Sequence, residues 1–232
     1  MGGTSLEMAL SKFLGPEDII TPISLEDEEA RFEWGFRVAQ NFQKNWSEMG
    51  VKDLGRVMQF LVGKMDRRPK RQALNRRRLP RRFWNHMSAR EARSLLGEQV
   101  WKDYFKLTVE RNPWDKVVSM FYWDQKGKRQ GQPFEEFVRS GMAYQSEYDR
   151  YSIGGIPQVD KIVRYENLEQ DLGEVSERVG FPENVYEVMK HIRAKGGFRK
   201  EGTFRDLYDE DLKRIIGFQY AREIALLGYC FD

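Results

Sequence analysis

The chain is poor in the residues that build several common kinds of functional site. Its 232 residues include one cysteine, Cys230, and two histidines. An internal disulfide and a cysteine-based zinc site are therefore excluded, and a histidine-ligated metal site has few ligands to draw on. No apolar run approaches the roughly 20 residues of a membrane span, and the N-terminus lacks the basic, apolar and small-residue regions of a signal peptide. We therefore expect a cytoplasmic protein without a membrane segment.

The net charge is also low, at +3 from 39 Lys+Arg and 36 Asp+Glu. On its own this value argues against a polyanionic partner. The average hides a basic arm, residues 64–82, in which ten Lys/Arg accompany a single acid, Asp66. The arm carries +9, so the rest of the chain carries −6.

The basic arm has three interpretations. Charge runs of this kind are usually solvated loops, and Pro69 and Pro80 interrupt any helix here. The arm is also suited to an anionic glycan acceptor, or to nucleic acid through phosphate contacts without sequence preference. Residues 64–82 contain no aromatic side chain, which weakens the case for stacking on single strands.

The remaining pattern predicts an α/β protein of one domain. Hydrophobic residues make up 40% and aromatic residues 13%, as in globular chains. Strands are predicted at 104–110 and 159–165, the second one buried, and residues 16–33 and 194–204 are predicted loops. Helices are predicted at 6–14, within 34–63 (best at 51–62), at 88–97, from 114, and at 134–138, 168–179, 185–192 and 209–227. In the helix at 88–97, Ser88 is the expected N-cap and Glu91 completes a capping box. Helices between strands imply a largely parallel sheet.

Two short segments carry the chemistry. The first is Gly2-Gly3-Thr4-Ser5, directly before an amphipathic helix. Glycines allow close backbone approach, the free N–H groups of a helix start favour a phosphate, and the two hydroxyls add donors. The alternative is that Thr4 or Ser5 is simply an N-cap. The segment is not a Walker A loop, because GxxxxGK[ST] occurs nowhere in the chain.

The second segment runs from Arg111 to Ser119 and reads RNPWDKVVS. It follows a predicted strand, and Pro113 begins the next helix. Arg111 is therefore expected at the carboxyl end of a sheet strand, where open α/β sheets bind ligands. Arginine with the Ser119 hydroxyl suits a terminal phosphate. The alternative is an ordinary strand-to-helix turn with a surface arginine.

These two segments, in this order, resemble those of the sulfotransferases that use 3′-phosphoadenosine-5′-phosphosulfate (PAPS), above all the Golgi carbohydrate sulfotransferases and their bacterial relatives. The resemblance covers nearly the whole chain and includes Arg164-Tyr165-Glu166-Asn167-Leu168 and Leu227-Gly228-Tyr229. It implies a P-loop-like three-layer fold and transfer of a sulfuryl group to a hydroxyl, without a metal. The product of PAPS would be adenosine 3′,5′-bisphosphate.

The resemblance also implies roles for individual residues. Gly2, Gly3, Thr4 and Ser5 would hold the 5′-phosphosulfate, and Arg111 with Ser119 the 3′-phosphate. A glycine-rich basic loop within residues 194–204 would close over that phosphate, unless it is simply a solvated turn. Tyr165 would lie near the adenine, unless its ring only packs in the core. The loop residues are Lys195, Gly197, Arg199 and Lys200.

The candidate base is His86, because a neutral imidazole suits removal of an alcohol proton near pH 7. An equally simple interpretation is a polar loop histidine. Glu110 and Glu166 are weaker candidates that would otherwise pair with Arg111 or Arg164, and His191 is expected on the surface.

The chain departs from the resemblance at its start, where the family's first strand and phosphate-binding Lys are absent before Met1. We therefore expect a single sulfotransferase-like domain over residues 1–232, truncated at its N-terminus. The acceptor is expected to be a glycan or small molecule, anionic or neutral, with no specific nucleic acid; the oligomeric state is left open. The alternatives are a nucleic-acid- or polyanion-binding protein that uses the arm, and an inactive sulfotransferase-like fragment.

Overall fold

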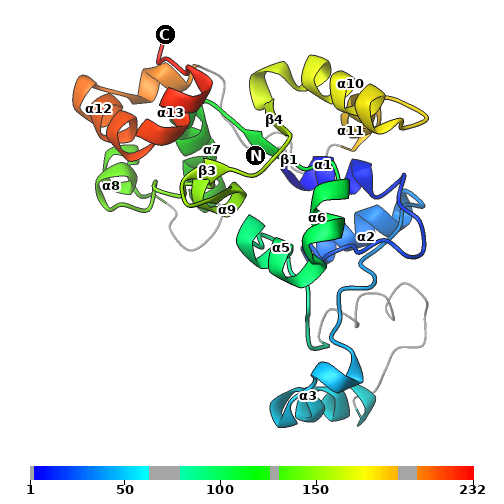
Figure 1. Cartoon of the computed structure of the whole chain (residues 1–232). Coiled ribbons are helices and arrows are strands. Elements are labelled where there is room, and N and C mark those ends of the chain that lie inside the picture. Colours follow the sequence, from blue (N-terminus) through cyan, green and yellow to red (C-terminus); the bar gives the residue numbers. More distant parts are fainter. Residues whose placement is uncertain (1–2, 63–78, 126–130, 193–202) are drawn as a thin grey trace. The chain divides into compact units, whose positions relative to one another are not determined.

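The computed structural model describes residues 3–62, 79–125, 131–192 and 203–232 (Figure 1). Two compact units are present, each assembled from segments that are distant in the sequence. Unit 1 comprises residues 1–3, 88–180 and 195–232, and unit 2 comprises residues 4–87 and 181–194. The expectation of one domain stays a prediction.

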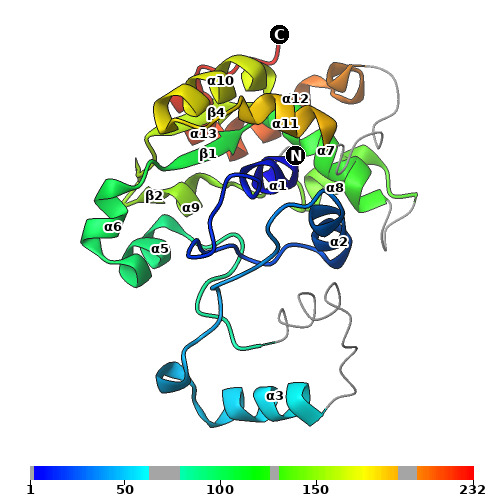
Figure 2. The ribbon, with the colours of Figure 1, turned by 90° about the vertical axis from the view of Figure 1, so that its right-hand side faces the viewer.

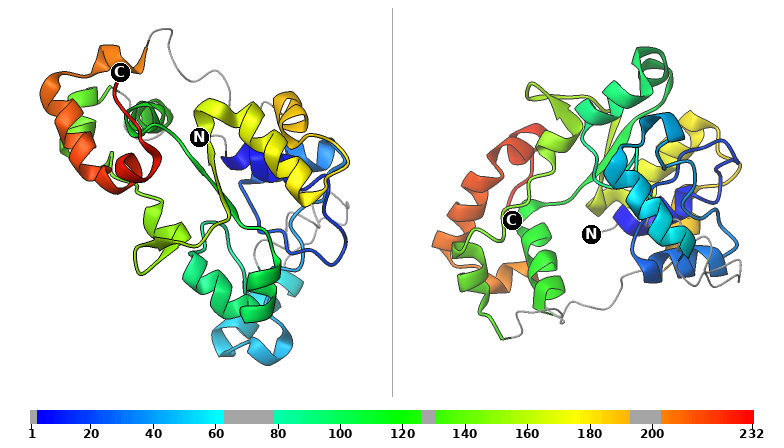
Figure 3. Two further views of the ribbon diagram at one scale, coloured as in Figure 1. Left: turned by 45° about the horizontal axis from the view of Figure 1, so that its top comes forward. Right: turned by 90° about the horizontal axis from the view of Figure 1, so that it is seen from below.

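The sheet of unit 1 confirms the two predicted strands and their parallel direction. Strand β1 (Leu107–Glu110) pairs with β4 (Lys161–Arg164) in a register that runs from Leu107↔Lys161 to Glu110↔Arg164. The two strands lie side by side in Figure 3, and α10 (Leu168–Val179) packs against β4. Of β4, only Val163 is fully buried. The described residues thus form a mixed helix–strand structure with a small parallel sheet. The three-layer, P-loop-like fold stays a prediction.

A helical core lies beside this sheet in unit 1. Helix α7 (Pro113–Gln125) begins at the proline that ends the β1 segment, and it packs with α12 (Glu210–Gln219) and α8 (Phe134–Arg139). Val117, Val118 and Phe121 of α7 are buried, and Tyr122 is half-buried. Burying these side chains contributes about 1.5–3 kcal/mol each. The core therefore holds α7 in place directly after the strand end.

The predicted helix over 209–227 is wrong as a single element. It is divided into α12 and α13 (Ala221–Leu227) at Tyr220. The Tyr220 ring is buried, its hydroxyl donates to the Ala143 carbonyl (2.7 Å), and the Gln145 N–H donates to that hydroxyl (2.9 Å). These tertiary contacts fix a backbone break that the continuous apolar pattern does not reveal.

The other elements of unit 1 are short. Helix α5 (Ala89–Leu96) has Ser88 as N-cap and the predicted capping box with Glu91. Strands β2 and β3 form a hairpin whose turn, Gly154-Gly155, has positive φ at both positions, as a two-residue hairpin turn requires. The remaining elements are α6 (Glu98–Asp103), α9 (Tyr148–Tyr151), β2 (Ser152–Ile153), β3 (Ile156–Pro157), η3 (Tyr165–Asn167) and η4 (Phe204–Leu207).

Unit 2 is helical and contains most of the N-terminal part of the chain (Figure 2). Of the predicted helix over 6–14, residues 6–10 lie in α1 (Gly3–Leu10), with Leu6 and Ala9 buried, whereas residues 11–14 lie outside it and that part of the prediction is wrong. Residues 51–62, the best part of 34–63, form α3 (Val51–Val62) as expected. The remaining elements are α2 (Leu25–Glu33), η1 (Trp46–Glu48) and α11 (Val185–His191).

The predicted loop over 16–33 is partly wrong, because residues 25–33 form α2. Ser24 caps this helix by accepting from the Asp27 N–H, and the acidic residues of the first turn favour the positive end of the helix dipole. Glu28 is buried rather than solvated. Its carboxylate pairs with Arg31 (3.1 Å) and accepts from the Ile23 and Ala39 N–H groups. A partner one turn later makes burial of this carboxylate possible.

None of the helices described in the structure is long and apolar enough to cross a membrane.

Candidate functional site

The best-defined candidate site lies in unit 1, where the two parallel strands end. The register pairs Glu110 with Arg164, so the residues that follow, Arg111 and Tyr165, leave the sheet next to each other. In α/β sheets this carboxyl edge is where ligands bind. Arg111 and Tyr165, which are 54 positions apart in the sequence, are thus brought together.

Arg111 is held in a defined orientation at this edge. Its guanidinium lies over the Tyr165 ring, 4.2 Å from the ring centroid. Its Nε donates to Asp115 Oδ2 (2.6 Å), and its Nη2 lies 2.5 Å from the same oxygen. The Arg111 side chain is 11% exposed. A charged, stacked and nearly buried arginine is a structural feature of phosphate sites, although here one carboxylate already compensates its charge.

Ser119 lies on the same helix face as Asp115, because the two residues are separated by one helical turn of α7. Its side chain is half-buried. Arg111, Asp115 and Ser119 therefore follow each other along one side of the strand-to-helix connection.

The C-terminal segment completes this edge of unit 1. Asn112 donates its backbone N–H to Glu166 Oε1 (2.7 Å) and its side-chain amide to the Cys230 carbonyl (2.8 Å). The Tyr229 hydroxyl donates to the second oxygen of Glu166 (3.2 Å). Burial, followed by the Glu166 charge, raises the pKa of Tyr229. Glu166 thus ties three segments together, and the expected pairing of Glu166 with Arg111 or Arg164 is wrong.

Glu110 belongs to a buried cluster behind the strand end. Its Oε2 lies 3.4 Å from Lys116 Nζ, and both side chains are at most 2% exposed. Glu223, also buried, accepts from the Ser146 hydroxyl. Burial raises the pKa of Glu110 and the nearby Glu223 charge adds to this effect, while Lys116 opposes it. Glu110 therefore pairs with Lys116, not with either arginine as expected.

Lys116 is the member of this cluster that the sequence interpretation missed. Its ammonium group also lies 5.5 Å from the centroid of the Tyr220 ring. The available signal was its position next to Val117 and Val118, since a lysine in the buried register of a helix requires a carboxylate partner.

The remaining candidate residues for the phosphate-binding loops lie at the start of α1 or outside the described residues. Gly3, Thr4 and Ser5 form the first turn of α1; Gly3 is exposed, and Thr4 and Ser5 are half-buried. Outside the described residues lie Gly2, Lys195, Gly197, Arg199 and Lys200.

The two histidines differ in backbone conformation. His86 is exposed and has φ 61°, in the left-handed region that only some polar residues tolerate. His191 ends α11 and is exposed as expected, with Nδ1 2.7 Å from the Glu187 carbonyl. Among the described residues, no group of three or more His, Cys, Asp or Glu could hold a metal ion.

Comparison with known proteins identifies a relative but no activity. A protein of Archaeoglobus fulgidus, described as an uncharacterized protein, is 34% identical over 119 residues, which cover 49% of this chain and 98% of the archaeal one. The chain belongs to the same family as this archaeal protein. No family model matches the chain, and no solved structure matches it. Functional arguments therefore rest on the residues themselves.

Proposed function

We propose that this protein is a sulfotransferase that moves the sulfuryl group of PAPS to a hydroxyl of a carbohydrate or related small molecule. The observation that carries the proposal is the placement of Arg111 over Tyr165 at the carboxyl ends of β1 and β4. The resemblance of the two sequence motifs, Gly2–Ser5 and Arg111–Ser119, agrees with it.

The donor set of Arg111 fits a phosphate even with Asp115 in place. A guanidinium has five N–H donors in a planar fork. Asp115 engages Nε and Nη2, so the two N–H groups of Nη1 remain for a 3′-phosphate. The Ser119 hydroxyl on the same face would add one further donor. Asp115 therefore orients the guanidinium and does not occupy the N–H groups proposed to bind the phosphate.

The proposed chemistry needs few catalytic groups. PAPS supplies an activated sulfuryl group, and its adenosine 3′,5′-bisphosphate part leaves. His86 accepts the proton of the acceptor hydroxyl as its oxygen forms the new S–O bond. The old S–O bond breaks and leaves its electron pair on the 5′-phosphate. Thr4 and Ser5, with the N–H groups that begin α1, would donate hydrogen bonds to that phosphate.

The first experiment measures thermal stabilisation by adenosine 3′,5′-bisphosphate. A ligand at 100 times its Kd stabilises the folded protein by about 2.7 kcal/mol, which corresponds to roughly 5–11 °C for a chain of this size. We expect this shift for the unaltered protein, none for Arg111→Ala, and a full shift for the control Arg139→Ala, which removes an exposed arginine of α8. An equal shift in Arg111→Ala and the control would refute the assigned phosphate site.

The second experiment tests the base. Transfer from labelled PAPS to a panel of sugar acceptors is measured for His86→Ala and for His191→Ala. We expect a loss of about 100-fold or more in the first, as for removal of a general base, and no loss in the second. Unchanged transfer in His86→Ala would remove His86 from the mechanism.

A further inference from the structure

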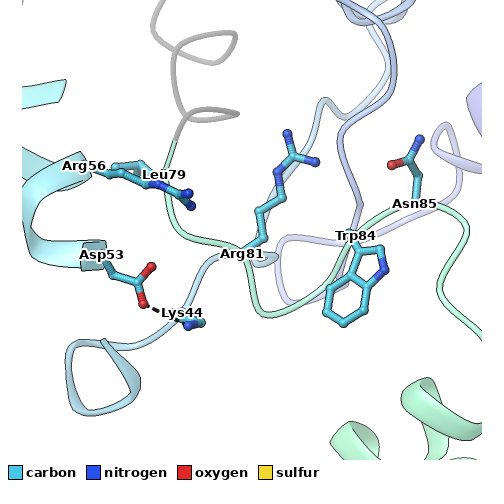
Figure 4. A pocket seen from close by; sticks show the side chains of 7 residues that line it. All are labelled: Lys44, Asp53, Arg56, Leu79, Arg81, Trp84 and Asn85. Atoms are coloured by element: carbon cyan, nitrogen blue, oxygen red, sulfur yellow. Dashed lines mark hydrogen bonds and ion pairs between the residues drawn. The ribbon is translucent and has the colours of Figure 1, made fainter. Parts of the chain in front are cut away.

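A cavity of about 530 Å³ lies within unit 2, in a part of the chain that the proposed phosphate site does not use (Figure 4). Its volume is within the range of about 300–1,000 Å³ that is usual for small-molecule sites. It is lined by Lys44, Asp53, Arg56, Leu79, Arg81, Trp84 and Asn85.

The walls of this cavity are joined by specific contacts. The Lys44 N–H donates to the Pro80 carbonyl (2.9 Å), and Gln43 forms an antiparallel bridge with Arg81. The Lys44 ammonium donates to Asp53 Oδ2 of α3 (2.8 Å), and this hydrogen bond lowers the pKa of Asp53. The cavity is therefore a built feature, because main-chain pairing holds one wall and an ion pair connects it to α3.

The charge of the cavity is positive. The described residues that line it include three cationic side chains and one carboxylate, so their net charge is +2. Lys44 is paired with Asp53, and Arg56 and Arg81 add two guanidinium groups to the lining. In Figure 4, Arg81 lies between Arg56 on one side and Trp84 with Asn85 on the other. Two guanidinium groups at one cavity favour a sulfate, phosphate or carboxylate group.

The other side of the cavity offers a flat apolar surface and an amide. The Trp84 ring is 36% exposed although it lines the cavity. A tryptophan face packs against planar or ring-shaped groups. The Asn85 amide and the Asp53 carboxylate are hydrogen-bonding partners for hydroxyl groups. A ligand that satisfies all of these groups has a ring, hydroxyls and an acidic substituent.

We propose that this cavity binds an acidic saccharide, with its ring on Trp84 and its sulfate or carboxylate on Arg56 and Arg81. His86, the candidate base, follows Asn85 directly in the chain, and its left-handed backbone turns the chain at this wall. The inference rests on the proposed function in one respect: it names the acceptor class of that reaction. Binding itself does not depend on transfer.

Single-stranded nucleic acid is the competing ligand, and the cavity is less suited to it. A strand needs successive aromatic platforms along a basic groove. The described residues that line the cavity include one aromatic side chain, Trp84, which does not make a row of stacking platforms. A hydroxyl-rich ligand with one or two acidic groups therefore fits the cavity better than a single strand does.

The test is calorimetric titration of the full chain with a sulfated disaccharide prepared from heparin, a neutral disaccharide and a 12-nucleotide single strand. We expect binding of the sulfated disaccharide alone, weakened about 10-fold or more by Arg56→Ala, in line with the loss of a charged hydrogen bond. Trp84→Ala should also weaken binding, with Trp84→Phe in between. Trp123→Ala and Arg139→Ala, which change exposed residues of unit 1, should bind as the unaltered protein does.

Three results would overturn the inference: equal binding of the neutral disaccharide, tighter binding of the single strand, or unchanged affinity in both cavity variants. Melting curves of the variants show whether each is folded, and Trp84→Phe keeps the test valid if Trp84→Ala is not. Stabilisation by adenosine 3′,5′-bisphosphate is measured in parallel. If the bisphosphate does not stabilise the protein but the saccharide binds, the sulfotransferase proposal is refuted and the saccharide site stands. If the bisphosphate stabilises the protein but the saccharide does not bind, the saccharide site is refuted and the sulfotransferase proposal stands.

Discussion

Lys116→Met should be among the most destabilising single substitutions in unit 1. Lys116 is 2% exposed, and its ammonium lies 3.4 Å from the carboxylate of Glu110, which is 2% exposed. The buried carboxylate of Glu223 is near enough to raise the pKa of Glu110. Methionine has a similar length and keeps the packing. The substitution therefore removes the positive charge that pairs with Glu110 and leaves this buried carboxylate without its cation, a change that typically costs about 3–5 kcal/mol. For a chain of this size the melting temperature should fall by roughly 6–20 °C.

The pH dependence gives this prediction a definite sign. The pKa of Glu110 is raised in the folded protein, so the folded state holds its proton more tightly than the unfolded chain does. Stability from this group is present below the unfolded pKa and is lost as the pH rises through the folded pKa. Without Lys116 the pKa of Glu110 rises further. The stability deficit of Lys116→Met should therefore be larger at pH 8 than at pH 5.

The assay is thermal unfolding followed by circular dichroism at pH 5 and pH 8. Adding Glu110→Gln to Lys116→Met should recover part of the lost stability, because it removes the buried carboxylate that Lys116 pairs with. The control is Lys190→Met, which breaks an exposed pair with Glu187 on α11 and should change stability by less than about 1 kcal/mol. A deficit that is independent of pH, or a double variant no more stable than Lys116→Met, would refute the reasoning.

Three further predictions concern other contacts. Arg111→Lys should lose the stabilisation by adenosine 3′,5′-bisphosphate measured by thermal shift, because an ammonium cannot bind a carboxylate and a phosphate with a planar fork; a retained shift would contradict the assigned geometry. Arg31→Met leaves buried Glu28 without its cation and should cost about 3–5 kcal/mol in urea unfolding, whereas a cost below 1 kcal/mol would disprove the role of the pair. Ser88→Ala removes the N-cap of α5 and should cost about 1 kcal/mol, with Ser88→Asn close to neutral; equal losses in the two variants would argue against capping.

Local signals predicted several elements well. The capping box of Ser88 and Glu91 placed the start of α5, and Gly180, with φ 78°, ends α10 at the predicted residue. Both are short-range effects: a cap satisfies N–H groups two or three residues away, and a left-handed residue terminates the helix next to it. The strand at 104–110 was recognisable because alternation and β-branching are also local properties.

Long-range contacts account for the errors. A loop was predicted over residues 16–33. No residue nearby in the sequence indicates that Glu28 is buried and accepts a hydrogen bond from the Ala39 N–H. The break at Tyr220 likewise depends on a hydrogen bond to Ala143, 77 residues earlier. Burial of both side chains also determines the pairing of Glu110 with Lys116, which the sequence did not predict.

For the candidate site, the amino-acid pattern alone indicates which residues are chemically competent and which strands they follow. Arg111 after a strand and Pro113 at the next helix start follow from spacing alone, as do the strand before Tyr165 and the basic arm hidden in a net charge of +3. The side chains that these residues contact are set by the tertiary structure. Parallel pairing of β1 with β4 brought Tyr165 under Arg111, and the packing of α7 placed Asp115 against the same guanidinium. The physical reason is that backbone propensities act over a few residues, whereas burial and ion pairing act between any groups that folding brings within a few ångströms.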